Sequence, residues 1–528
     1  MLKRMENSDI TEQLECQVRN MLVRIQRVEK VGEEDVVLAQ AKWRTLDILV
    51  LPHSIIFSDR DGVDEGEGGE GVEGGDGGDG GREEVYISGE SYIQHGRVDN
   101  LLWIQAIPKI NTRRVYIQVS VEGERTDIEN IHNALSRFRK PGRKPLLVFI
   151  NPFSGTRRGL EKWKTVAGIV SGSGLEYKEI ITEKRNHARD LIQNMDLDLY
   201  SGVVTVSGDG LIHEVLNGLS MREDWEERRR KFPIGFVPGG SGNAIHCSLL
   251  YQQDEDFRDE LLVSSLNLSR GVSKPGDYLE CETEEKSFLS MFGVAWGLVP
   301  DCDLGSEVIR WAGFLRVYIW LLFRILNPTF YRGYVHYLPL QPDTEKPYPL
   351  PDIHQPVPKH WTSIQGDFLT VYALRQSWVD YSTQILDDAR LDDGIIHLVI
   401  VRVLSRVEML NWFLGLGNHK DTNHGLTTII PVSAFRFEME NINDPLTVDA
   451  ERLTCKKVQG RIIPSGLRLL VKEDTQENQV NQENQENKEN KENKENKEKK
   501  EDKENKNTQE NQENKNTQEN QENIDNLR

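Results

Sequence analysis

Gly202-Val203-Val204-Thr205-Val206-Ser207-Gly208-Asp209-Gly210 and, about thirty residues on, Phe232-Pro233-Ile234-Gly235-Phe236-Val237-Pro238-Gly239-Gly240-Ser241-Gly242-Asn243 share one pattern. In each, an apolar run of strand type ends in a glycine-rich turn, and a segment with helical spacing follows. Parallel sheets build phosphate cradles in this way, because glycines let the backbone approach the ligand and a helix N-terminus offers free N–H donors. Asp209 lies between two glycines, so the pattern predicts a carboxylate beside the phosphates, as phosphoryl transfer to a hydroxyl requires.

A third unit of the same kind lies upstream. The apolar run 145–150 ends in Asn151-Pro152-Phe153-Ser154-Gly155-Thr156-Arg157-Arg158-Gly159, a loop that suits a phosphate contact. A strand-like run at 177–181 leads into Thr182-Glu183-Lys184-Arg185-Asn186-His187-Ala188. A lone Gly-Asp-Gly is more often an ordinary tight turn, in which the aspartate bonds its own backbone. The succession of strand, glycine loop and helix favours a phosphate site instead.

These loops resemble the first conserved blocks of the diacylglycerol-kinase-type lipid kinases. The stretches 182–188 and 207–219 resemble the sphingosine kinases in particular, and so does Ala295-Trp296-Gly297-Leu298-Val299-Pro300-Asp301-Cys302-Asp303. The resemblance covers about residues 144–470 and is specific as a set of motifs. It implies an α/β nucleotide-binding domain followed by a β-sandwich lipid-binding domain, the diacylglycerol kinase or NAD kinase-like fold, with the active site in the cleft between them.

The same resemblance implies ATP with Mg²⁺ as the phosphoryl donor and a sphingoid long-chain base as the acceptor, giving sphingosine 1-phosphate. Asp209 matches the catalytic aspartate, which takes the proton of the acceptor hydroxyl, and Ser207, Gly208 and Gly210 are expected on the substrate side. Residues that match the family's other blocks are expected at the nucleotide; they are Asn151, Pro152, Phe153, Thr182, Glu183, Lys184, Arg185, Asn186, Glu214, Gly240, Ser241, Gly242, Arg310, Arg316, Asp449, Ala450 and Glu451. The metal ligands are left open.

Asp303 matches the aspartate that holds the lipid head group. A carboxylate in a half-buried cleft would pair with the sphingoid ammonium and discriminate against neutral lipids such as diacylglycerol. Asp301 is the competing candidate for this role. The strongly apolar segment 311–326 predicts a long helix, which is either ordinary core or, by resemblance, a flap over the acyl-chain tunnel. Its apolar rim would also suit docking to a membrane surface.

The last block departs from the family pattern at one position. Val448-Asp449-Ala450-Glu451 has alanine where glycine is usual. If that position needs a positive φ, alanine costs about 1 kcal/mol or more, which puts the nucleotide contact there in doubt. Arg310 and Arg316 have an alternative interpretation as side chains that snorkel on an amphipathic helix. His213 falls within a motif without a triad partner and is interpreted as a hydrogen-bonding scaffold.

Composition narrows the class of partner and the compartment. The chain of 528 residues has a formal net charge of −20, and an acidic chain argues against nucleic acid as a partner. The five cysteines form no CxxC pair, which indicates reduced thiols in a cytoplasmic protein. No uncharged apolar run reaches the ~18 residues of a membrane span, so recruitment to membranes would be peripheral.

The chain divides into four parts. Residues 1–140 predict a small strand-rich module, with strands in 41–57, 84–93, 101–107 and 114–121 and a helix at 127–138; it is either pleckstrin-homology-like or a cap on the kinase. Within it, residues 59–81 carry nine acidic residues against one arginine, which predicts a flexible loop. Residues 141–265 predict the α/β nucleotide-binding domain, because strands and helices alternate.

Residues 266–472 predict the β-rich lipid-binding domain, with strands at 288–296, 333–338, 367–374, 395–403, 434–439 and 461–471. The tail 473–528 repeats Gln-Glu-Asn and Lys-Glu-Asn and is expected to be disordered. Two functions compete with a sphingosine kinase. One is a kinase for ceramide or diacylglycerol, and the other is a catalytically weak lipid-binding scaffold.

Overall fold

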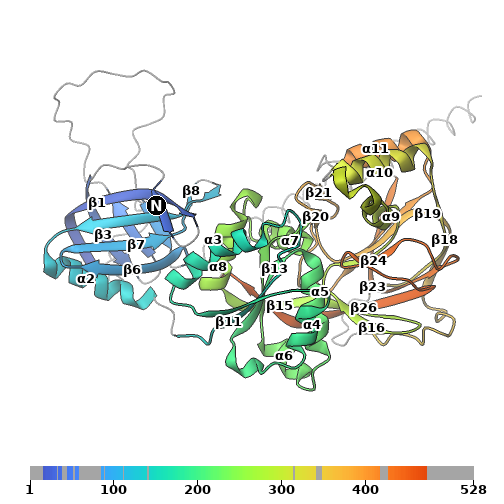
Figure 1. Ribbon diagram of the computed structural model, residues 1–528, viewed down its shortest axis with the longest axis horizontal. Helices are drawn as coiled ribbons and strands as arrows, with labels where there is room; N and C mark the ends of the chain where they lie inside the picture. The colour runs from blue at the N-terminus through green and yellow to red at the C-terminus, as the bar shows by residue number, and fades with distance from the viewer. Residues whose placement is uncertain are drawn as a thin grey trace, which may run out of the picture. The chain divides into compact units, whose positions relative to one another are not determined.

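A computed structural model describes residues 16–31, 34–37, 44–51, 54–58, 85–88, 90–110, 112–138, 142–312, 315–340, 348–416 and 426–472 (Figure 1). The predicted acidic loop at 59–81 and the repeat tail at 473–528 lie outside these residues. In the described part, no helix is long and apolar enough to span a bilayer.

The N-terminal module is an antiparallel sheet with one helix. Its strands follow the order β5-β4-β3-β1-β10-β7-β6, and β2 pairs with β1. Helix α2 (Arg125–Leu135) buries Ile128, Ile131 and Leu135 in the core of the module, as the predicted amphipathic spacing requires. The strands are β1 (Cys16–Val31), β2 (Glu34–Val37), β3 (Arg44–Leu51), β4 (Ser54–Ser58), β5 (Val85–Ser88), β6 (Tyr92–Val98), β7 (Leu101–Ala106) and β10 (Ile117–Glu122). No strand was predicted in residues 16–31, which form β1.

A hairpin of this module reaches the α/β domain. It comprises β8 (Lys109–Ile110) and β9 (Arg113–Arg114). The buried Arg114 guanidinium lies 2.6 Å from Glu255, and Lys472 donates to the same carboxylate. A small apolar cluster also joins the two parts, formed by Ile93, Ile107, Tyr116, Ile169 and Leu266. These contacts are what a cap on the kinase would make, and the pleckstrin-homology-like interpretation stays a prediction.

The α/β domain contains four parallel strands in the order β12-β11-β13-β14. They are β11 (Leu146–Ile150), β12 (Tyr177–Ile181), β13 (Gly202–Ser207) and β14 (Ile234–Pro238), as the apolar runs predicted. Helices α3 (Gly159–Gly172) and α8 (Glu260–Ser269) share a core with one face of this sheet. Helices α4 (His187–Ile192), α5 (Asp209–Ser220) and α7 (Ala244–Gln252) share a core with the other face (Figure 1). The remaining helices of this domain are α6 (Trp225–Lys231) and the short 3₁₀ helices η2 (Leu197–Leu199) and η3 (Phe257–Asp259).

The second domain is built from antiparallel strands whose pairing closes on itself. Strand β18 (Tyr331–Pro339) pairs with β19 (Thr362–Leu374), which pairs with β22 (Ile396–Arg402). Strand β22 then pairs with β23 (Thr427–Met439), which returns to β18. The other strands of this sheet are β15 (Val272–Thr283), β16 (Ser287–Ser290), β17 (Gly293–Gly297), β24 (Leu446–Val448), β25 (Glu451–Arg452) and β26 (Lys457–Val471). An α/β domain followed by a β-sandwich is the predicted fold class.

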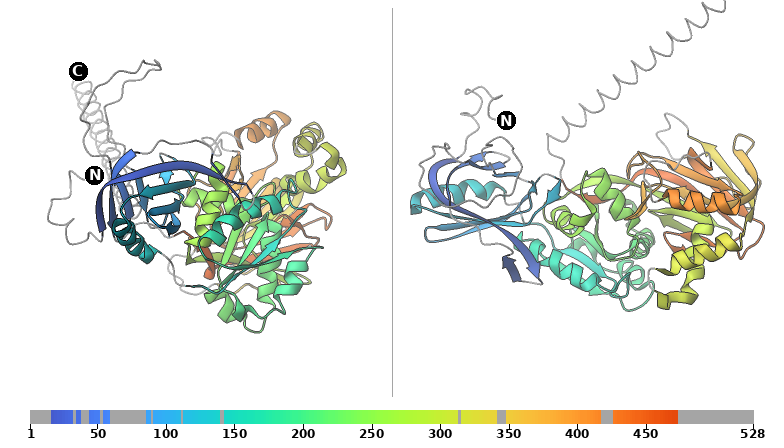
Figure 2. Two further views of the ribbon diagram at one scale, coloured as in Figure 1. Left: turned by 60° about the vertical axis from the view of Figure 1, so that its left-hand side comes forward. Right: turned by 90° about the horizontal axis from the view of Figure 1, so that it is seen from above.

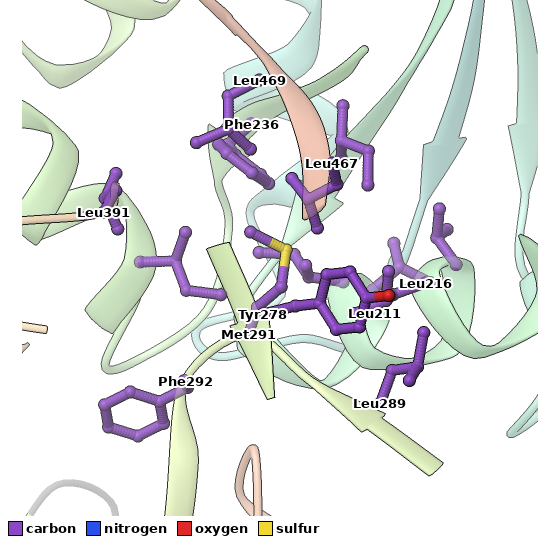
Figure 3. Packing of buried hydrophobic residues seen from close by; sticks show 14 of the residues in the cluster. Leu211, Leu216, Phe236, Tyr278, Leu289, Met291, Phe292, Leu391, Leu467 and Leu469 are labelled. Carbon is purple, nitrogen blue, oxygen red and sulfur yellow. The ribbon is translucent and has the colours of Figure 1, made fainter. Parts of the chain in front are cut away.

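The two domains share strands and core. Strand β26 pairs with β14 at Leu469 and Ile234, so one hydrogen-bonded sheet runs through both domains (Figure 2). Side chains of both domains also share one apolar cluster, in which Leu211, Leu216 and Phe236 of the first domain gather with Met291, Leu467 and Leu469 of the second (Figure 3). The active-site turns therefore rest on a core to which both domains contribute.

Two predicted elements of the second domain were wrong in their limits. The strand expected at 288–296 is broken at Met291 and Phe292, because their backbone N–H groups turn aside to donate to the Asp449 carboxylate. The helix expected at 311–326 is shorter than predicted: residues 306–312 form a 3₁₀ helix, η4 (Ser306–Ala312), and α10 is Leu315–Leu326. Apolar spacing over a single turn cannot distinguish a repeat of 3.0 from one of 3.6 residues.

Candidate active site

Three glycine-bearing loops meet where β11, β13 and β14 end. A Cβ on Gly155, whose φ is +50°, would lie 2.6 Å from the carbonyl carbon of Gly240. A Cβ on Gly240 would in turn lie 2.5 Å from the Cα of Gly208. Real Cβ atoms do not tolerate such distances, so the backbones of the three loops touch only because these positions are glycine. The sequence predicted each loop, and the structure brings them together.

Hydrogen bonds fix the loops to one another. The Gly208 N–H donates to Ser154 Oγ over 3.2 Å, and the Gly239 N–H donates to the Ser207 carbonyl over 3.0 Å. Within the third loop, the Gly240 N–H donates to Asn243 Oδ1 over 2.8 Å. Asn243 has a φ of 55°, a conformation that asparagine adopts more readily than most residues. Ser154 and Asn243 were absent from the predicted site, although an asparagine directly before a helix is a recognisable cap signal.

Asp209 is the first residue of α5 and lies against the N-terminus of α7. Its buried carboxylate accepts hydrogen bonds from the Ala244 N–H (3.0 Å) and the Ile245 N–H (3.1 Å). Burial raises the pKa of Asp209 to about 6, although the two N–H donors oppose this shift. The group is therefore ionised at neutral pH and close enough to its pKa to accept a proton, which suits a general base.

The loop after β12 faces the same turns. The Asn186 N–H donates to Glu214 Oε1 over 2.8 Å, and burial raises the pKa of that glutamate. The Thr182 hydroxyl is buried and donates to the Ile150 carbonyl over 3.3 Å. Arg185 is exposed and pairs with Glu451, a residue that comes from the distant β24–β25 hairpin. Glu183 and Lys184 are exposed at the same loop.

Asp449 lies beneath this surface. Its carboxylate accepts hydrogen bonds from Ser290 Oγ (2.6 Å), the Phe292 N–H (2.9 Å) and the Gly293 N–H (3.1 Å). His213 Nδ1 lies 2.9 Å from its other oxygen, which is the scaffold role expected of that histidine. Burial alone would raise the pKa of Asp449, but the hydrogen bond with His213 and the other donors lower it. Both oxygens already have protein partners, so a direct nucleotide contact by Asp449 stays a prediction.

Ala450 occupies a left-handed turn. Asp449 and Ala450 have φ angles of 48° and 66° and form the two-residue connection between β24 and β25. A two-residue hairpin with positive φ at both positions matches a type I′ turn, which favours glycine at the second. Alanine therefore stands at a position with a positive φ, which is the case in which a steric cost was expected. Glu451 directly follows, and its Oε1 would be 3.2 Å from a Cβ on Gly210.

The two candidate head-group aspartates differ sharply in their surroundings. Both lie in α9 (Leu298–Gly305). Asp301 is buried, and its oxygens accept from Arg324 Nη2 (3.0 Å) and the Tyr331 hydroxyl (3.1 Å). Asp303 has a side chain that is 48% exposed, and its contact is Arg316 Nη2 at 3.4 Å. The Asp301 carboxylate is thus occupied by structural contacts, whereas the exposed part of the Asp303 carboxylate is accessible to a ligand.

The charges of Asp303 and of the candidate base Asp209 both act on Tyr372, a buried residue of β19. Burial raises the pKa of the Tyr372 hydroxyl, and the negative charges of Asp209, Asp449 and Asp303 raise it further. Burial also raises the pKa of Asp303, against the opposing charge of Arg316, while Glu451 adds to the rise. Tyr372 is therefore within electrostatic reach of both the head-group candidate and the base candidate.

The remaining predicted site residues have the following positions. Asn151 Oδ1 accepts from the N–H of Phe153, whose ring is exposed, and Pro152 lies between them. Ser241 is exposed and Gly242 half-buried in the third loop. Arg316 is in the first turn of α10, beside Asp303 rather than beside the glycine turns. Arg310 belongs to η4, and its side chain lies outside the described residues.

In the described part of the chain, no group of three His, Cys, Asp or Glu side chains could hold a metal ion. Mg²⁺ at a phosphoryl-transfer site usually needs only one or two carboxylates, since substrate phosphates and water supply the other ligands. Glu451, half-buried beside Gly210, meets that limited requirement. The residues fit a Mg²⁺ ion that is held mainly by a nucleotide.

Comparisons with known proteins find relatives of this chain. Residues 145–278 match the family model of the diacylglycerol kinase catalytic domain. Sphingosine kinase 1 of Rattus norvegicus is 32% identical over 344 residues, which cover 61% of this chain and 89% of the rat protein. Sphingosine kinase 1 of Homo sapiens is 33% identical over 342 residues, with shares of 61% and 89%. A crystal structure of a putative diacylglycerol kinase from Bacillus anthracis str. Sterne is 13% identical, with a TM-score of 0.44 and coverage of 63% and 98%.

The left-handed turn generates a stability prediction. Replacing Ala450 by glycine should raise the free energy of unfolding by about 1 kcal/mol, because glycine adopts a positive φ without the steric penalty of a Cβ. Urea titration of tryptophan fluorescence measures the change. Ala134→Gly is the matched control: Ala134 lies within α2, so the same substitution should there lower stability by about 1 kcal/mol. A decrease in stability for Ala450→Gly would contradict the strained-turn interpretation.

Proposed function

The chain belongs to the sphingosine kinase family, and from this premise we propose how it transfers the γ-phosphate of ATP to the primary hydroxyl of a sphingoid long-chain base. The observation that supports the mechanism is the pair of carboxylates around Tyr372. Asp209 is buried at the meeting point of the glycine turns, and Asp303 is half-exposed nearby with a free side. One can serve the reacting hydroxyl while the other holds the amine of the same lipid.

The glycine turns bind the nucleotide. Their backbones approach one another without side chains in between, so they offer a surface on which phosphates can lie close to N–H groups. Arg185 and Lys184 supply cationic charge at the rim of the loop after β12, where they would balance the phosphates. Phosphoryl transfer then depends chiefly on in-line placement and on charge balance, because its transition state is loose.

Asp209 acts on the acceptor. The two α7 N–H donors hold its carboxylate in one orientation, and that orientation is prepared before the substrate arrives. Asp209 accepts the proton of the lipid hydroxyl late in the transfer, when the new O–P bond has largely formed. Because the pKa of Asp209 is about 6, its ionised form dominates at neutral pH.

Asp303 selects the lipid. A sphingoid base carries an ammonium group near its terminal hydroxyl, and the half-exposed carboxylate can pair with it. Ceramide has an amide in place of the amine and diacylglycerol has no nitrogen, so neither neutralises Asp303. Asp301 cannot take over this role without losing Arg324 and Tyr331.

Mg²⁺ is proposed as the cofactor. When bound, it neutralises charge on the phosphates of ATP. Glu451 is the residue of this chain that we assign to it, through water or directly, because its carboxylate lies beside Gly210 at the start of α5. Arg185 pairs with that carboxylate.

Membrane docking is proposed for the face formed by α10 and α11 (Arg406–Leu416). The two helices touch, since the Tyr318 and Phe413 rings lie 6.0 Å apart. Their exposed apolar side chains form what we term the apolar rim: Tyr318, Ile319, Leu322, Phe323, Leu326, Val407, Leu410 and Leu414. Such a face suits a lipid surface, from which the long-chain substrate must be drawn. Cys247, Cys281, Cys302 and Cys455 are free thiols, which supports a cytoplasmic enzyme that is recruited peripherally.

A lipid panel tests the function. The wild type should transfer labelled γ-phosphate to sphingosine but not to ceramide or diacylglycerol. Asp303→Asn should reduce kcat/KM for sphingosine at least about tenfold, because a charge-assisted contact with the lipid ammonium is lost. Glu307→Gln, which removes an exposed carboxylate in the following η4, serves as the charge control and should stay near wild type. Preference for ceramide or diacylglycerol, or no transfer to any lipid, would contradict the proposal.

The pH profile tests the base. Transfer to sphingosine should fall as the pH drops below about 6, because protonation of Asp209 removes the base. The sign follows from its raised pKa: an unshifted carboxylate would keep its charge to pH 4. The measurement is kcat between pH 5 and 8 under saturating ATP. A kcat that stays level down to pH 5 would contradict this assignment.

Vesicle sedimentation tests the apolar rim. Leu322→Glu should weaken binding to phosphatidylcholine–phosphatidylserine vesicles about tenfold, since an apolar side chain is lost and a charge must approach lipid. Leu199→Glu, the same change at an exposed leucine in η2 of the α/β domain, is the control and should bind like the wild type. Equal binding by all three proteins would remove the rim as the docking surface.

A further inference from the structure

The Asn243 side chain forms hydrogen bonds with both the N–H and the carbonyl of Gly240 in the third glycine loop. The Gly240 N–H donates to Asn243 Oδ1 over 2.8 Å, and Asn243 Nδ2 donates back to the Gly240 carbonyl over 3.0 Å. Asn243 is buried and immediately precedes α7. The shape of the loop therefore depends on the orientation of the Asn243 amide, that is, on which positions its oxygen and its nitrogen occupy.

A tyrosine from the second domain determines that orientation. The second N–H of Asn243 Nδ2 donates to the Tyr381 hydroxyl over 2.9 Å. The Tyr381 hydroxyl donates its own hydrogen to Glu260 Oε2, and Lys162 Nζ donates to the other oxygen of that carboxylate over 2.7 Å. A phenol has a single hydrogen, so once it is given to Glu260 the oxygen can only accept. A flipped Asn243 amide would bring two acceptor oxygens together, and the observed orientation is favoured.

Tyr381 is itself held against α7. It lies in the turn between β20 (Trp378–Asp380) and β21 (Thr383–Gln384). Ser248 of α7 binds β20 twice, accepting from the Trp378 N–H (3.0 Å) and donating to its carbonyl (3.3 Å). The Tyr381 ring packs edge-on against Phe257, with centroids 6.0 Å apart. Burial and the Glu260 charge both raise the pKa of Tyr381, so its hydroxyl keeps the hydrogen that the arrangement needs.

We propose that Tyr381 is a positioning residue for nucleotide binding: its hydroxyl, held by Glu260 and Lys162, keeps the Asn243 amide in the orientation that shapes the Gly240 turn. The inference rests on the proposed function in that the Gly240 turn binds ATP. It goes further by making a residue of the lipid-binding half responsible for the form of the nucleotide site. Lys162 is in α3, directly after the first glycine loop, so the same chain of contacts links that loop to the third.

Calorimetric titration with Mg²⁺–ATP, without lipid, tests the role on the full-length chain. Tyr381→Phe should weaken ATP binding about tenfold, because Asn243 loses the acceptor that fixes its amide. Tyr251→Phe is the matched control: its hydroxyl donates to the Asp387 carbonyl, and its ring also contacts Trp378, but it is not connected to Asn243. The control should bind ATP like the wild type.

Kinetics separate positioning from general stability. Tyr381→Phe should raise the KM for ATP about tenfold while the KM for sphingosine stays within about twofold. Glu260→Gln should weaken ATP binding too, and the double variant should be no weaker than Tyr381→Phe alone, since both changes break one chain of contacts. Unchanged ATP affinity in Tyr381→Phe, or equal weakening in Tyr251→Phe, would overturn the proposal. ATP binding without transfer to sphingosine would instead contradict the proposed function and leave this test intact.

Discussion

The hydrogen bonds between the Asp209 carboxylate and the first N–H groups of α7 are the interaction on which the site depends. They join the end of β13 to the helix that follows β14, and so fix two glycine turns relative to each other. They also hold the base before the substrate arrives. This position buries the carboxylate. Loss of water raises its pKa and the two N–H donors lower it, and the resulting pKa is about 6. That compromise is what a base at neutral pH requires.

Three aspartates around Tyr372 show how surroundings assign separate roles to one side chain type. Asp449 receives donors on both oxygens and has a lowered pKa, so it organises the backbone between β16 and β17. Asp209 receives two N–H groups, fewer donors than Asp449, and its raised pKa leaves it able to take a proton. Asp303 keeps an exposed side and a single long contact with Arg316, which leaves it open to an ammonium group. The roles follow from burial and donor count rather than from position in the sequence.

Much of this arrangement follows from local sequence, and the rest depends on long-range contacts. Glycine loops after apolar runs predicted the α/β domain and the phosphate turns, because each signal lies within about ten residues. The burial of Asp449 could not be predicted, since its partners are near residues 213 and 290. The break in the strand expected at 288–296 has the same distant cause. Tyr381 carries no local signal at all: it meets Asn243 across 138 residues. The family resemblance already favoured Asp303 over Asp301, and the structure adds a physical reason, because Arg324 and Tyr331 occupy the Asp301 carboxylate.

The most direct test of the account compares Asp209→Asn with the wild type in transfer of labelled phosphate to sphingosine, with ATP binding and thermal unfolding measured in parallel. Asparagine retains an oxygen for the α7 N-terminus but cannot act as a base. The account predicts a folded variant that binds ATP within a few-fold of the wild type and transfers phosphate at least about 100-fold more slowly. Transfer above about a tenth of the wild-type rate would show that Asp209 serves only as a helix cap, and would contradict the central claim.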